Sequence, residues 1–355
     1  MSKKKLELLF SKCSSCGDDM HFDADGQCLT CPSCKSKKEI TKTTTYQKHQ
    51  LNDDVLLNHN NENLLLLKKE LNCLNCGALI SVEGYDISAH CPYCNTSMLL
   101  KSIEQWGLKP DAIIPFSISK GLAGEIFKAK IKKNWLVPKS LKKSFKIEDI
   151  NAFYYPSFVF GAKCSTEYNA RVYDIKTTTD KDGKTRSYRS YSTSSGQYFS
   201  SHQDVIIETS TKFTQEEILL VRPYDFTKAV DYSNDYVFGY DVESYSSSVN
   251  EAFDSAHYII KGEIERELTN DLLRYNDGVS SLNVNIAYIN RDFYYCFLPI
   301  YRTSFKYKDK SYSNVINGQT GAFGGKLPKS GWKISLIVLL PILAIMAIIL
   351  LTLFI

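Results

Sequence analysis

Histidine is scarce in this sequence, with 6 residues in 355, and none forms the His-Glu-x-x-His pattern of zinc-dependent hydrolases. The Gly-x-Ser-x-Gly turn that presents a nucleophilic serine is also missing. Gly183-Lys184-Thr185 matches only the end of a phosphate-binding loop, because Thr178 stands where such a loop needs its first glycine. We therefore predict no nucleotide-binding site and expect a protein that is not an enzyme.

A strong excess of one charge is missing as well. Lys and Arg total 43 and Asp and Glu total 39, and the resulting net charge of +4 is too small to indicate a partner. Apolar residues make up 43% and charged residues 23%, which is typical of a chain that buries a core. The 23 tyrosines and 18 phenylalanines favour β-structure. The opening apolar run is short and interrupted by Glu7, so we expect no signal peptide.

What the sequence does contain is a duplicated cysteine pattern. A Cys-x-x-Cys pair, a glycine, a spacer and a Cys-Pro-x-Cys pair occur once, and the whole pattern recurs sixty residues later. Two such pairs joined by a short hairpin place four thiolates at the corners of a tetrahedron, as a closed structural zinc site requires. The predicted ligands of the two zinc ions are Cys13, Cys16, Cys31 and Cys34, then Cys73, Cys76, Cys91 and Cys94.

Alternative assignments of these cysteines are less favoured. Iron-binding knuckles resemble them, but neither Cys34 nor Cys94 is followed by glycine. Cys28 aligns with Ser88 of the second copy, and it is either a spare thiol or a replacement for Cys31. Closely spaced cysteines of this kind would be at risk of oxidation outside the cell, so they favour a reducing cytosol. A site closed by four thiolates has no open position for catalysis.

The pattern along the chain predicts an α+β protein with a β-rich, mainly antiparallel domain that contains two helices. Ser119 is the expected N-cap of the first helix, and Ser248-Val-Asn-Glu251 forms a capping box for the second. A polar hairpin is expected between about 166 and 200, with its turn at Asp182-Gly183. The predicted units are zinc ribbon 1 at 1–40, a linker at 41–70, zinc ribbon 2 at 71–105, the α+β domain at 106–325 and a transmembrane anchor at 326–355.

The C-terminal run is the basis of the membrane prediction. Ile334 to Ile355 are 22 residues without a charge, and a helix of that length covers about 33 Å, enough for a bilayer core. Lys326, Lys329 and Lys333 precede the run. By the positive-inside rule, the sequence predicts a tail-anchored, single-pass membrane protein with its N-terminal bulk in the cytoplasm.

A run of lysines lies between Glu125 and Glu148 with no acidic residue inside it. Three interpretations are open: a solvated helix face, contact with an anionic lipid surface, or contact with nucleic-acid phosphates. The lysines assigned to the lipid interpretation are Lys128, Lys130, Lys132, Lys133, Lys142 and Lys143; Lys139 and Lys146 complete the run.

Taken with the ribbons and the apolar C-terminus, the segment from Leu108 to Phe116 and the Asn317-Gly-Gln-Thr-Gly end support a resemblance. The chain resembles a bacterial family of membrane-anchored zinc-ribbon proteins whose ribbons are similar to those of transcription factor IIB. These proteins are often labelled replication-restart, or primosomal, helicase-like. The resemblance implies zinc binding and membrane attachment, and the eight knuckle cysteines match its pattern while Cys28 departs from it. Helicase activity is not implied here, because the nucleotide-binding motif is missing.

These observations lead to two functional hypotheses. The first is a membrane-anchored, zinc-binding scaffold or adaptor, without catalytic activity, that presents its cytoplasmic domain to a protein partner at the membrane. The alternative is a nucleic-acid-binding, replication- or transcription-associated zinc-ribbon factor without helicase activity, which would use the ribbons and the lysine run.

Overall fold

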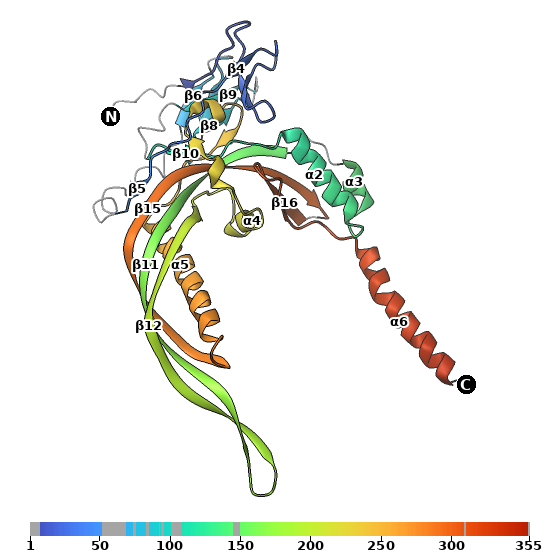
Figure 1. Ribbon diagram of the computed structural model, residues 1–355. Helices are drawn as coiled ribbons and strands as arrows, with labels where there is room; N and C mark the ends of the chain where they lie inside the picture. Colours follow the sequence, from blue (N-terminus) through green and yellow to red (C-terminus); the bar gives the residue numbers. More distant parts are fainter. Residues whose placement is uncertain are drawn as a thin grey trace.

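The chain folds as an α+β protein. Figure 1 shows the N-terminal strands gathered at one end of a long curved sheet, and helix α6 extending away from the body. The computed structural model describes residues 8–51, 69–73, 76–82, 85–91, 93, 96–100, 108–144, 150–308 and 310–353.

The central feature is a 9-stranded sheet in which β12, β11 and β15 are long neighbouring antiparallel strands. These three strands curve together, and helix α5 lies on their concave side (Figure 1). The strands of this sheet are β5 (His49–Gln50), β10 (Ala112–Ile113), β11 (Ile150–Thr179), β12 (Thr185–Glu208), β13 (Val230–Asp231), β14 (Asp241–Val242), β15 (Gly278–Tyr307), β16 (Lys310–Asn317) and β17 (Phe323–Gly325).

Side chains of β11 alternate between two buried faces, as the period of a strand requires. Tyr154 and Phe158 pack in the cluster that contains the buried face of α5, and Tyr155 and Val159 pack in a second cluster with Ile218. The sheet is therefore covered on both sides along this part of β11. The helices are α2 (Lys120–Lys133), α3 (Lys139–Ser144), α4 (Gln215–Leu219), α5 (Val249–Leu272) and α6 (Gly331–Leu353), with 3-10 turns η3 (Phe226–Lys228) and η4 (Asn234–Tyr236).

Both helices expected in the domain are present. Ser119 caps α2 by accepting a hydrogen bond from the Leu122 N–H, and Ser248 and Glu251 form the predicted capping box of α5. The buried residues of α5 recur at spacings of three and four, so one stripe of the helix faces the sheet. The predictions for these two helices are confirmed, but the described part of the domain also contains α3 and α4, which were not predicted.

The predicted hairpin is also present, and it is longer than expected. Strands β11 and β12 pair without interruption from Ala162 out to Thr179 and Thr185. Gly183 has a φ of +77°, and the Asp180 carboxylate accepts from the N–H of Asp182 and of Lys184, which closes the turn. The end of the hairpin projects beyond α5 (Figure 1).

The segment predicted as a linker packs on the body where it is described. Its strand β5 pairs with β15, the His49 ring lies 2.7 Å from the Asp111 carboxylate, and Leu51 is buried. Tyr46 packs on Tyr294 with ring centroids 4.9 Å apart. Residues 41–51 therefore form a strap across the sheet. The rest of the predicted linker up to residue 68, with a short helix expected at 55–57, lies outside the described residues.

The structure contradicts the predicted transmembrane anchor. Among the described residues, which end at 353, no helix is both long enough and apolar enough to cross a bilayer. The prediction relied on the apolar run and, for its orientation, on the three lysines that precede it. Of these, Lys333 is buried inside the first turn of α6, where its ammonium group donates to the carbonyls of Trp135 and Val137. The predictions of a tail-anchored membrane protein and of a cytoplasmic orientation are therefore wrong.

Candidate metal centres

In the first ribbon, short backbone turns bring the cysteines together. The Cys13 N–H donates to the Asp18 carbonyl at 2.8 Å, and the Gly17 N–H donates back to the Cys13 carbonyl at 2.9 Å. Gly17 has a φ of +79°, a conformation that favours glycine. The second pair uses the same device, since the Cys31 N–H donates to the Ser36 carbonyl at 2.9 Å. These turns present the sulfur atoms to a common point between the strands.

The second ribbon repeats this geometry sixty residues later. The Cys73 N–H donates to the Ala78 carbonyl, the Cys91 N–H donates to the Thr96 carbonyl, and Gly77 has a φ of +75°. Strand β8 occupies the positions of β3 plus sixty. The strands of ribbon 1 are β2 (His21–Asp23), β3 (Cys28–Thr30) and β4 (Lys37–Glu39), and those of ribbon 2 are β6 (Lys69–Asn72), β7 (Leu79–Val82), β8 (Ser88–His90) and β9 (Ser97–Leu100).

The sulfur atoms form two clusters that could hold a metal ion. All the sulfur atoms of Cys13, Cys16, Cys31 and Cys34 lie within 4.8 Å of one another, as do those of Cys73, Cys76 and Cys91. The sequence also predicts Cys94 as a ligand of the second cluster, but Cys94 lies outside the described residues.

The spacing of the sulfur atoms fits zinc. Cys13 and Cys34 have their sulfurs 3.5 Å apart, and the Cys76 and Cys91 sulfurs are 3.6 Å apart. A tetrahedral zinc ion with bonds of about 2.3 Å holds its sulfur ligands about 3.8 Å from one another. A disulfide would need about 2.05 Å, and none joins the described cysteines. The spacing is therefore that of thiolate ligands around one metal ion, with four sulfurs in the first cluster and three among the described residues of the second.

Ser36 is a further residue of the first cluster. Its hydroxyl lies 2.9 Å from the Cys13 sulfur and 3.1 Å from the Cys34 sulfur. The hydrogen bond with Ser36, followed by those from the backbone of Cys16 and Ser15, lowers the pKa of Cys13 to about 5. Ser36 also lowers the pKa of Cys34. Because the thiolate is the form that binds a metal, Ser36 favours the binding-competent state.

A sequence feature beyond the cysteine pattern could have pointed to Ser36. Sixty residues after Ser36 stands Thr96, which keeps a hydroxyl at the same place in the second ribbon. A hydroxyl that recurs with the cysteines indicates a shared local role.

The three cysteines outside the predicted ligand sets take no part in the described clusters. Cys28 is 7% exposed on β3 and its sulfur contacts Thr30 at 3.7 Å, so Cys31 stands in the cluster and Cys28 does not. Burial raises the pKa of Cys164 and of Cys296. Both thiols are fully buried in the body and behave as small core side chains.

Ribbon 1 is bound to the body through the chain that precedes β14. The Phe22 N–H donates to the Phe238 carbonyl at 3.0 Å, and the Tyr240 hydroxyl donates to the Phe22 carbonyl at 3.3 Å. At the hairpin between β2 and β3, the Gln27 amide donates to the Phe116 carbonyl at 2.7 Å. The ribbon therefore lies directly on the sheet domain.

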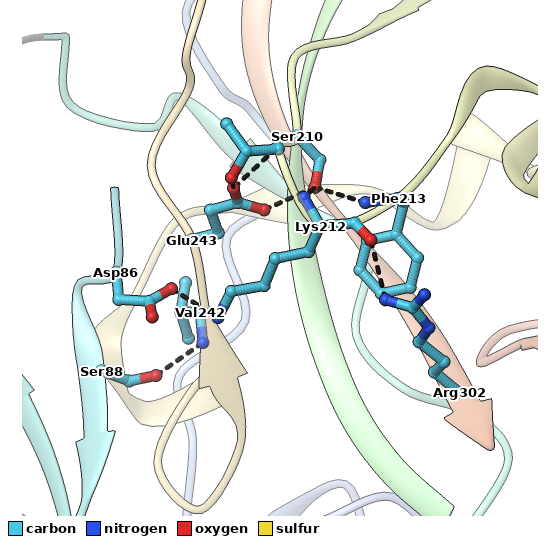
Figure 2. Close-up of polar contacts among 9 residues, drawn as sticks. Asp86, Ser88, Ser210, Lys212, Phe213, Val242, Glu243 and Arg302 are labelled. Carbon is cyan, nitrogen blue, oxygen red and sulfur yellow. Dashed lines mark hydrogen bonds and ion pairs between the residues drawn. The ribbon is translucent and has the colours of Figure 1, made fainter. Parts of the chain in front are cut away.

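Ribbon 2 is bound to the continuation of the same segment, as Figure 2 shows. The Val242 N–H donates to the Ser88 hydroxyl at 2.6 Å, and the Ile87 N–H donates to the Val242 carbonyl at 3.1 Å. Beside these bonds, Lys212 forms an ion pair with Asp86 at 2.5 Å. The Ser244 N–H donates to the Tyr85 carbonyl at 2.7 Å.

Glu243 fixes this segment to the neighbouring loop. Its side chain is 2% exposed, and it accepts from the Ser210 hydroxyl at 2.5 Å and from the Thr211 N–H at 2.7 Å. The Thr211 hydroxyl also donates to it. Figure 2 shows this network between the two chain segments, next to the Lys212–Asp86 pair. A buried carboxylate held by several donors makes the segment a rigid support for ribbon 2.

The two ribbons are also joined to each other. Strand β1 (Leu8–Leu9), which precedes the first cysteine of ribbon 1, pairs antiparallel with β9 of ribbon 2. The next residue, Phe10, packs against the buried cluster that contains Cys73, Cys91 and Met98. The start of ribbon 1 therefore completes the core of ribbon 2.

The lysine run lies away from both clusters, on α2 and α3. The side chains of Lys128, Lys130, Lys132, Lys133 and Lys139 are exposed, and Lys142 donates to the Lys132 carbonyl at 3.2 Å. The side chain of Lys143 and the whole of Lys146 lie outside the described residues. The structure thus places most of the run at the surface, and it does not bring the run to the ribbons.

Comparison with known proteins gives one informative match. No protein-family model matches the chain, and no solved structure matches it. The chain is 25% identical over 339 residues to a Bacillus subtilis (strain 168) protein described as "Uncharacterized protein YdjG", and the alignment covers 92% of each chain. The resemblance to ribbons of the transcription factor IIB type stays a prediction. The chain is thus similar, over nearly its full length, to a protein whose description names no activity.

Proposed function

We propose that the protein is a zinc-binding scaffold whose two ribbons and sheet domain form one surface for a protein partner. One observation carries the proposal: both ribbons are hydrogen-bonded to the same short segment, residues 238–244. Ribbons that served only as flexible appendages would not need this shared support. The arrangement favours a role in which the relative positions of the ribbons matter.

The role that we propose for zinc is structural. Cys13, Cys16, Cys31 and Cys34 would hold one ion, and Cys73, Cys76 and Cys91 would hold the second together with Cys94. Zinc supplies folding free energy to segments too small to form a core, on the order of 10 kcal/mol per site. Four thiolates fill its coordination shell, so the ion has no position for a substrate.

Ribbon 2 carries the surface that we assign to the partner. Leu79 is 61% exposed and Tyr93 is 76% exposed, although each stands within three residues of a cysteine of the second cluster. Exposed aromatic and aliphatic side chains on a rigid support are typical of the residues that dominate protein interfaces. The partner is therefore expected to contact ribbon 2 through these two side chains.

The test is affinity purification of the tagged full-length chain from its own cells, with and without nuclease, followed by identification of the bound proteins. We expect a stoichiometric protein that survives nuclease and is lost when Leu79 and Tyr93 are both changed to alanine. A matched variant, Trp135→Ala, removes an exposed aromatic side chain far from the ribbons and should retain the partner. Partners that disappear with nuclease, or that bind the double variant equally well, would contradict the proposal.

A further inference from the structure

A groove of about 430 Å³ lies between the end of α2 and the segment that joins β17 to α6. Both of its walls carry lysines: Lys130 and Lys133 on the helix, and Lys326 and Lys329 on the segment. Phe323 and Leu327 contribute its apolar lining. In Figure 1 this is the region where α2 and α3 meet the start of α6, remote from the ribbons.

The walls of the groove are held in place by contacts at both ends. The Phe323 ring packs against Phe127 of α2 with centroids 5.9 Å apart. At the other end, the Ser330 N–H donates to the Leu136 carbonyl at 2.8 Å, and the buried Lys333 ammonium donates to the Val137 carbonyl at 3.1 Å. The four lysines therefore converge because the fold ties the two segments together. Lys130 and Lys133 are three residues apart on a helix and share one face.

The charge in the groove is not balanced by its own lining. No carboxylate is among the described residues that line it. Burial, followed by the nearby charges of Lys142 and Lys139, lowers the pKa of Lys333, so the positive field extends beyond the groove itself. Four ammonium groups gathered without a counter-charge repel one another, and an anionic ligand would relieve that repulsion.

We propose that this groove is a binding site for a small phosphate-bearing ligand, with phosphates between the four lysines and an apolar portion against Phe323 and Leu327. Ammonium groups bind phosphate oxygens as point charges. The Lys130 ammonium lies 5.9 Å from the centre of the Phe323 ring, so charged and apolar contacts adjoin. The volume lies within the range of about 300–1,000 Å³ that is usual for small-molecule sites. This site is independent of the metal clusters and of the scaffold role.

The experiment uses the full-length protein and calorimetric titration with inorganic pyrophosphate at low ionic strength. The groove variants are Lys130→Gln with Lys133→Gln, and Lys326→Gln with Lys329→Gln. The matched control, Lys128→Gln with Lys132→Gln, removes the same charge from the same helix at exposed positions that do not line the groove. We expect each groove variant to weaken binding at least about tenfold, which corresponds to 1.4 kcal/mol, and the control to change it less than about threefold.

A second arm identifies the source of the phosphate. Vesicles of phosphatidylglycerol are compared with vesicles of phosphatidylcholine by co-sedimentation. Binding that needs phosphatidylglycerol and is lost only in the groove variants assigns the phosphate to a lipid headgroup, whereas groove-specific binding of pyrophosphate alone assigns it to a soluble ligand. Either result supports the site. The proposal is overturned if neither probe binds, or if the control variant loses as much affinity as the groove variants. Equal losses would indicate an extended basic surface, such as one that binds nucleic acid.

Discussion

At the scale of single residues, Ser36 favours metal binding at the cysteine cluster of ribbon 1. Its hydroxyl contacts two of the four sulfurs in ribbon 1 and lowers the pKa of both thiols. Without it, protons would compete better with the metal for Cys13 and Cys34. The stabilisation of the thiolates is fully present above the ordinary pKa of a free thiol, and it is lost as the pH falls through the lowered pKa of each thiol in the folded chain.

We predict that Ser36→Ala weakens zinc binding at ribbon 1 by about tenfold to a hundredfold, as is usual for groups that hydrogen-bond to metal ligands. The loss should grow as the pH is lowered, because the thiols of the variant have the higher pKa. Competition with a chromophoric chelator at several pH values measures it. Ser33→Ala is the control, since Ser33 donates to Asp18 and not to a sulfur. Equal affinities for wild type and Ser36→Ala would refute the role.

Glu243 provides a second prediction at this scale. Its buried carboxylate accepts bonds from Ser210 and Thr211, so Glu243→Ala leaves these donors unsatisfied. We expect the free energy of unfolding to fall by about 1–3 kcal/mol, measured by urea denaturation of the zinc-loaded protein. Glu216→Ala, at an exposed position of α4, should change it by less than about 0.5 kcal/mol. Similar values for the two variants would show that the network does not support the segment.

At the scale of elements, the hairpin and the ribbons differ in how they are attached to the body. The outer part of the hairpin is a pair of exposed strands, and its last buried contacts are those of Ala170 and Val172 with Leu272. The ribbons, in contrast, are tied into the body by hydrogen bonds on both sides of β14.

Replacing residues 174–190 by Asn-Gly should therefore leave the melting temperature within a few degrees of wild type. The opposing pair Tyr173 and Tyr191 would then flank the new turn, and the buried contacts of Ala170 and Val172 would be retained. Differential scanning calorimetry measures the change, and the zinc content should be unaltered. A large drop in melting temperature would show that the arm contributes to the core.

Removal of zinc should loosen the segment that supports both ribbons. We predict faster hydrogen exchange at the amides of Phe22, Val242 and Ser244 after chelation, because each of these amides donates a hydrogen bond between a ribbon and the body. The amides of β11 paired with β15 serve as the internal control and should stay protected. Unchanged exchange at Val242 and Ser244 would mean that the ribbons fold without the metal.

What could be predicted from the sequence was local. The caps and apolar spacing that predict α2 and α5 lie within each helix, and the turn at Asp182-Gly183 closes its own hairpin. The strap that contains β5, the docking of the ribbons on 238–244 and the pairing of β1 with β9 could not be predicted. Each joins residues distant in the chain. Many of these contacts use backbone groups, and the side chains that take part, such as Ser88 and Tyr240, stand at no spacing that would single them out in the sequence. The membrane prediction rested on the apolar run from Ile334, and no helix among the described residues is long and apolar enough to cross a bilayer.

At the scale of the whole molecule, the chain combines two metal clusters, a curved sheet and a basic groove at separate places. The clusters lie at the end of the sheet where residues 238–244 meet both ribbons, and the groove lies where α2 meets the start of α6. This separation allows the scaffold role and the proposed phosphate site to be tested independently. The cysteine clusters are the part of the account on which the rest depends.

The most direct test of that part is the zinc content of the purified full-length protein, determined by elemental analysis and native mass spectrometry. We predict two zinc ions per chain, one in Cys13→Ser, one in Cys91→Ser and two in Cys28→Ser, because Cys28 lies outside the cluster. A wild-type chain that binds one ion or none, or a Cys28→Ser variant that loses an ion, would contradict it.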